Sequence, residues 1–154
     1  MANLANAIER YLKRLLAQSE TGTVSVQRNQ LAETFSCAPS QISYVLATRF
    51  LLEHGYLVET RRGGGGYVRI TLLRMDSEQD WRLLLDSIGE AINQGRSEAI
   101  INRLQREGII NEREAMLMRA GLSRAALNIK LPWRDMVRAD ILRAMLIALQ
   151  QAKN

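Results

Sequence analysis

The sequence predicts a mainly α-helical protein with one small β-hairpin, divided into two parts near residues 75–77. Apolar residues recur at helical spacing through most of the 154 residues. Two strand-like runs, residues 56–60 and 68–72, enclose the segment Arg-Arg-Gly-Gly-Gly-Gly-Tyr at 61–67. Positive charge is concentrated in residues 1–75, which carry nine basic and five acidic residues, against twelve and eleven in residues 76–154. At 47% hydrophobic, the chain can bury the core of one medium or two small domains.

The first part has the element order of a winged helix-turn-helix. A helix over roughly 4–16 is followed by a short extended piece at 24–26 and a short helix at 30–35. A turn at 36–38 leads to Pro39, whose missing N–H costs nothing in the first turn of a second short helix. The hairpin comes next. This order predicts a winged helix-turn-helix domain over residues 1–74.

The second part, residues 77–154, reads as entirely helical. Ser77 is a suitable N-cap, and an apolar stripe from Trp81 to Ile92 predicts a single helix. A second apolar stripe ends at Gly108. We expect these two helices to pack against each other and against the two that follow.

The last two helices have clear beginnings. Asn111, with Glu114 three residues later, matches a capping box. Pro132 is placed to open the final helix. Apolar residues of that helix occupy a face wider than one neighbouring helix can cover, so part of it is available to a partner.

The outer face of residues 40–49 carries side chains that suit a DNA major groove. Gln41 can bond both N6 and N7 of adenine, and Arg49 can reach a phosphate or a guanine. An ordinary solvated helix face is the alternative. The neighbouring hairpin and the basic first half favour double-stranded DNA as the partner.

The glycine-rich segment is the more specific signal. A hairpin turn needs one or two glycines, so four of them beside Arg61 and Arg62 exceed what turn geometry requires. A backbone without Cβ atoms can approach the floor of a narrow minor groove, whose negative potential attracts arginine. A flexible loop is the alternative. A nucleotide-binding loop does not fit, because no Gly-Lys-Ser/Thr follows and the segment joins two strands.

Other functional classes have little support. The single histidine, His54, and the single cysteine, Cys37, offer no catalytic or metal-ligating set, so we expect no enzyme activity and no cofactor. No stretch approaches the ~18 apolar residues of a membrane span, and the first residues do not resemble a signal peptide. We therefore expect a soluble cytoplasmic protein with no membrane partner. A protein-interaction adaptor on a winged-helix scaffold is the alternative to a DNA-binding protein.

Residues 31–45 and 48–50, together with residues 61–70, closely resemble the CtsR family. The resemblance includes Pro-Ser-Gln-Ile at 39–42 and Arg-Gly-Gly-Gly-Gly-Tyr at 62–67, and extends to residues 112–115 and 131–132. Members of this family repress class III stress genes in low-G+C Gram-positive bacteria. The resemblance implies a homodimeric repressor that binds short direct-repeat operators near heat-shock genes for Clp-type chaperones and proteases.

The resemblance also implies roles for particular residues. The helix would enter the major groove, the wing would enter the minor groove, and Arg28 would contact the DNA backbone. Heat would release the wing, a protein-arginine kinase would phosphorylate Arg62, and the Clp protease machinery would be a partner. The residues expected to contact DNA are Arg28, Ser40, Gln41, Ser43, Tyr44, Thr48, Arg49, Arg61, Arg62, Gly63, Gly64, Gly65, Gly66 and Tyr67. Those expected to form the dimer are Trp133, Val137, Ile141, Met145 and Leu149.

Overall fold

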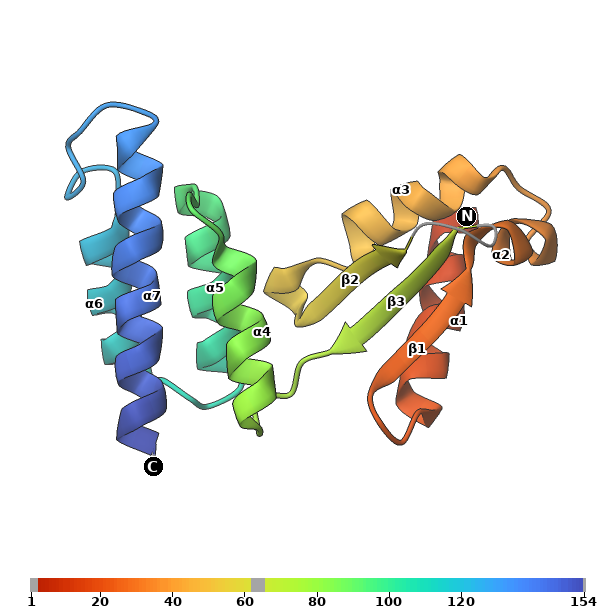
Figure 1. Cartoon of the computed structure of the whole chain (residues 1–154), viewed down its shortest axis with the longest axis horizontal. Coiled ribbons are helices and arrows are strands. Elements are labelled where there is room, and N and C mark those ends of the chain that lie inside the picture. Colours follow the sequence, from red (N-terminus) through yellow and green to blue (C-terminus); the bar gives the residue numbers. More distant parts are fainter. Residues whose placement is uncertain (1–2, 62–65, 154) are drawn as a thin grey trace. The chain divides into compact units, whose positions relative to one another are not determined.

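The computed structural model describes residues 3–61 and 66–153, which form two compact units, Met1–Leu73 and Arg74–Asn154 (Figure 1). Helices dominate both units, and a small antiparallel sheet lies in the first, so the predicted fold class is confirmed. The first unit consists of α1 (Leu4–Gln18), β1 (Thr23–Gln27), α2 (Arg28–Thr34), α3 (Pro39–Arg49), the 3-10 turn η1 (Leu52–His54), β2 (Tyr56–Arg61) and β3 (Tyr67–Leu72).

The sheet of the first unit has the strand order β1-β3-β2. Along β3, the fully buried Val68 and Ile70 alternate with more exposed residues, so one face of the sheet supplies the core. The helices cover that face with their own apolar residues. The core joins Val68 and Ile70 to Ile8, Leu12, Leu16, Leu31, Ala32, Ile42, Val45, Leu46 and Phe50.

The turn between α2 and α3 sets the direction of α3. Ser36 has a positive φ of 52°, and the Cys37 amide donates to the carbonyl of Ala32 at 2.9 Å, which closes the end of α2. Pro39 then occupies the first turn of α3, as predicted. The three buried residues of α3, Ile42, Val45 and Leu46, fix which side of this helix faces away from the core.

The second unit contains α4 (Glu78–Ile88), α5 (Gln94–Arg106), α6 (Glu112–Leu122) and α7 (Trp133–Lys153). The predicted N-cap at Ser77 is confirmed, because its hydroxyl accepts from the amide of Asp80 at 3.2 Å. The capping box is also confirmed: the Asn111 side chain accepts from the Glu114 amide at 2.8 Å, and the Glu114 carboxylate accepts from the Asn111 amide at 2.9 Å.

The prediction of a single helix from Trp81 to Ile92 was wrong. The helix ends at Ile88, and Ile92 lies in the connection to α5, where it is buried and its amide donates to the carbonyl of Asp135 in α7 at 3.0 Å. Its spacing from Ile88 imitates a further helical turn. The contact that buries it comes from a distant part of the chain.

A buried arginine connects three segments of the second unit. Arg138 in α7 is 1% exposed, beside the fully buried Ala139 and Leu142. Its guanidinium donates to the carbonyl of Leu122 at 2.8 Å, to the carbonyl of Ile92 at 3.1 Å and to the carboxylate of Asp135 at 2.5 Å. Buried charges persist when they are paired and hydrogen-bonded in this way. The arginine therefore fastens α7 to the end of α6 and to the α4–α5 connection.

Within the described ranges, 3–61 and 66–153, no helix is both long enough and apolar enough to cross a lipid bilayer.

Candidate DNA-binding interface

The outward side of α3 begins with three exposed side chains. Ser40, Gln41 and Tyr44 are all exposed, and 60% of the surface of Tyr44 is accessible. None of the three side chains makes a hydrogen bond to another residue in the part of the chain that the structure describes. Their donors and acceptors are therefore available to an external partner, and their contact with DNA stays a prediction.

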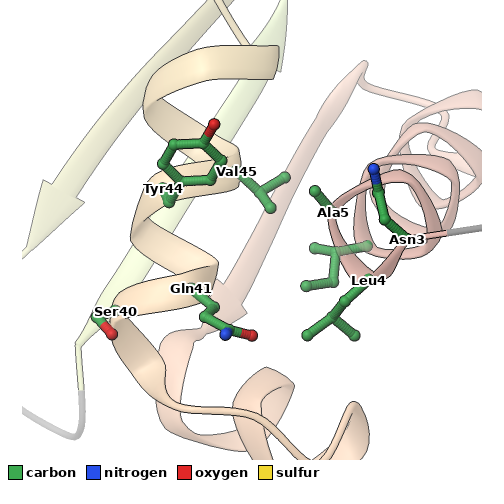
Figure 2. A pocket seen from close by; sticks show the side chains of 8 residues that line it. Asn3, Leu4, Ala5, Ser40, Gln41, Tyr44 and Val45 are labelled. Atoms are coloured by element: carbon green, nitrogen blue, oxygen red, sulfur yellow. The ribbon is translucent and has the colours of Figure 1, made fainter.

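A pocket of about 420 Å³ lies between the beginnings of α1 and α3 (Figure 2). Figure 2 shows Gln41 pointing across it toward Leu4, while Ser40 points away from α1. The lining is Asn3, Leu4, Ala5, Ile8, Ser40, Gln41, Tyr44 and Val45. The pocket thus puts apolar surface directly beside the amide of Gln41.

The last turn of α3 is engaged within the protein. Thr48 donates its hydroxyl to the carbonyl of Tyr44 at 2.7 Å. Arg49 donates to the carboxylate of Glu9 at 2.8 Å and to the side-chain oxygen of Asn6 at 2.9 Å, both in α1. Arg49 therefore links α1 and α3, and its side chain is 33% exposed.

The carboxylate that holds Arg49 is kept ionised by its surroundings. The Lys13 ammonium lies 2.7 Å from the Glu9 carboxylate and, by hydrogen bonding, is the main reason that the pKa of Glu9 is lowered. Burial opposes this by raising the pKa, and the hydrogen bond from Arg49 lowers it further. Glu9 therefore stays charged at neutral pH and holds the end of α3.

Arg28 lies at the junction of β1 and α2 and contacts both candidate DNA-binding elements. Its guanidinium donates to the hydroxyl of Ser43 in α3 at 2.9 Å. Its backbone amide donates to the carbonyl of Gly66, beside the first residue of β3, at 3.1 Å. A Cβ on Gly66 would lie 3.1 Å from both Nε and Nη2 of Arg28, so the backbone of the hairpin packs directly against the guanidinium.

The end of the hairpin is described on both sides of residues 62–65. Arg61 and Tyr67 are paired across β2 and β3 and both are exposed, Tyr67 to 48%. Gly66 has a φ of 82°, which disfavours any residue with a Cβ. One of the four glycines is therefore explained by local backbone and packing. Arg62 and Gly63, Gly64 and Gly65 lie outside the described residues, so their roles stay predictions.

The residues expected to form the dimer differ in exposure. Trp133 is 61% exposed, whereas Val137, Ile141, Met145 and Leu149 are half-buried. The prediction missed two strongly exposed apolar residues of α6, Met116 and Leu117, at 62% and 68%. Their position was readable from the sequence, because they are out of phase with the buried Ala115, Met118 and Leu122. All of these side chains belong to the second unit.

Metal-ligating side chains do not assemble among the described residues. No cluster of three or more His, Cys, Asp or Glu side chains there could hold a metal ion. Cys37 is partly buried in the turn between α2 and α3, where it lines a shallow depression.

The fold and the exposed face of α3 define a winged helix-turn-helix protein. Models of the "CtsR N-terminal HTH domain" and the "CtsR C-terminal dimerization domain" match residues 3–74 and 76–147. The chain therefore belongs to the CtsR family of transcriptional regulators, and the resemblance found in residues 31–70 is confirmed.

Similar proteins cover nearly the whole chain. The transcriptional regulator CtsR of Geobacillus stearothermophilus is 46% identical over 151 residues, which are 97% of this chain and 99% of that protein. The regulator of the same name from Bacillus subtilis (strain 168) is 43% identical over 152 residues, covering 96% and 97%. A crystal structure of CtsR in complex with a 26 bp DNA duplex is similar at a TM-score of 0.67, with 47% identity over 96% of this chain and 98% of that one.

Proposed function

We propose that this protein is a homodimeric transcriptional repressor that reads double-stranded DNA with α3 and the hairpin and dimerises through its second unit. The observation that carries the proposal is the face formed by Ser40, Gln41 and Tyr44, which is exposed and makes no side-chain hydrogen bond to described residues. A similar protein has been crystallised in complex with a DNA duplex, which supports DNA as the partner of this chain. Such a regulator acts in the cytoplasm, where bacterial DNA is found.

A salt titration of binding to a DNA duplex tests this proposal. A protein that neutralises phosphates releases counterions, so the logarithm of its affinity falls linearly with the logarithm of salt concentration, by roughly 0.9 per phosphate contacted. We expect a steep slope and a marked preference for one sequence over its scrambled form. A flat salt response with no sequence preference would instead support a protein-interaction adaptor.

The targets we propose are direct-repeat operators upstream of heat-shock genes for Clp-type chaperones and proteases. Membership of the CtsR family supports this assignment. Selection of bound duplexes from randomised DNA, followed by a search for repeated half-sites, tests it. A selected sequence with a single site or an inverted repeat would contradict the direct-repeat arrangement.

We propose that heat, or phosphorylation of Arg62 by a protein-arginine kinase, releases the repressor, and that the Clp protease machinery then removes it. A phosphoryl group would replace a cation with a negative charge at an anionic groove, which opposes binding. The variant Arg62→Asp should lose operator binding while remaining a folded dimer. Normal operator binding by Arg62→Asp would rule out release at this position.

A further inference from the structure

Arg28 hydrogen-bonds both α3 and the hairpin. Through its side chain it holds the hydroxyl of Ser43 at 2.9 Å, and through its backbone amide it holds the carbonyl of Gly66 at 3.1 Å. Both bonds come from the same residue, which stands at the start of α2. A displacement of the hairpin end is therefore transmitted to the residue that bonds α3.

The chemistry of the guanidinium suits this position. It is planar and rigid, and it presents several donors in fixed directions, so it can bond Ser43 on one edge while packing against the Gly66 backbone. A hydrogen bond with a charged donor is worth about twice a neutral one. Arg28 is also partly buried, which limits competition from water for its bond to Ser43.

We propose that Arg28 is a positioning residue that fixes the hairpin end relative to α3, so that the two elements contact DNA at one fixed distance from each other. This role goes beyond a contact with a phosphate and rests on the proposed DNA-binding function. Phosphate contacts raise affinity for every sequence, whereas a fixed spacing raises affinity for the sequence that matches it. The Arg28–Ser43 bond therefore contributes to operator selectivity.

A double-mutant cycle on the full-length dimer tests the proposal. Arg28→Lys keeps the charge but loses the planar guanidinium with its fixed donors. Ser43→Ala removes the hydroxyl that accepts from Arg28. The third variant combines the two changes. The readout is the ratio of affinities for a selected operator and a scrambled duplex, with the salt slope measured for each. We expect each single change to lower the ratio roughly tenfold, since hydrogen bonds to charged groups are worth about 1.5–3 kcal/mol, and the double variant to lower it no further.

The matched control is Ser40→Ala, the same chemical change in the same helix at a hydroxyl that Arg28 does not bond. Its effect should add to that of Arg28→Lys. Additive effects of Arg28→Lys and Ser43→Ala, or equal losses on operator and scrambled DNA, would overturn the positioning role and leave DNA binding intact. A wild-type protein without sequence preference would instead contradict the proposed function.

Discussion

Replacing Gly66 with alanine tests the geometry of the hairpin end. Gly66 has a φ of 82°, and a left-handed backbone costs an L-residue about 1–2 kcal/mol. The added Cβ would also lie 3.1 Å from Nε and Nη2 of Arg28, so the guanidinium must move by only a few tenths of an ångström and can keep its bond to Ser43. Backbone strain therefore sets the size of the effect. If the free protein relieves this strain by relaxing the hairpin end, binding to DNA must restore the strained backbone. The operator Kd then rises about 5–30-fold.

Gly108→Ala is the matched control, because Gly108 has a similar φ of 74°, with nothing within 4 Å of an added Cβ, and lies in the second unit. Gly108→Ala should lose about 1–2 kcal/mol of unfolding free energy in urea titrations, and Gly66→Ala should lose less, because relaxation of the hairpin end removes the strain from the free protein. Only Gly66→Ala should weaken operator binding in fluorescence anisotropy at a temperature where both are folded. Unchanged operator affinity in Gly66→Ala, or an equal loss in Gly108→Ala, would refute the reasoning.

Two further predictions concern stability. Arg138→Leu leaves two buried carbonyls and Asp135 without their donor. It should lower the free energy of unfolding by about 3–5 kcal/mol, measured by thermal unfolding of the full chain. A loss below about 1 kcal/mol, as for an exposed arginine, would disprove that this side chain holds the three segments together. Because the pKa of Glu9 is lowered from its ordinary value of 4.5, its ion pairs with Lys13 and Arg49 should stabilise the fold fully above that pH and be lost as pH falls through the lower folded value. The stability difference between wild type and Glu9→Gln, up to about 1 kcal/mol at pH 7, should therefore shrink as the pH falls below 4.5, and a difference that grows on acidification would contradict this sign.

Elements specified by local chemistry were predictable from the sequence. The capping box at Asn111 and Glu114, the N-cap at Ser77 and the helix start at Pro39 each depend on residues within one turn of one another. For the same reason, the strands flanking residues 61–67 were predictable from β-forming residues on both sides of a turn signal. The exposed start of α3 followed from the phase of its apolar residues.

Features that depend on distant segments were not predictable. From the sequence alone, Arg49 is expected to be a free cation. In the fold its guanidinium lies 2.8 Å from the carboxylate of Glu9, which is 40 residues away in the sequence. Arg138 is buried only because the carbonyls of Leu122 and Ile92 converge on it. Ile92 has the spacing of a helical residue, yet α7 supplies the contact that holds it outside α4. In each case the local sequence pattern fits more than one structure, and a contact with a distant segment of the chain determines which one forms.

The most direct test is the ratio of affinities of the wild-type dimer for a selected operator and for a scrambled duplex of the same composition, at one physiological salt concentration. If Gln41 and Tyr44 read bases beside the hairpin, the operator should bind at least about 10³-fold more tightly, and Gln41→Ala with Tyr44→Ala should remove most of that preference. Equal affinities for the two duplexes would contradict the account.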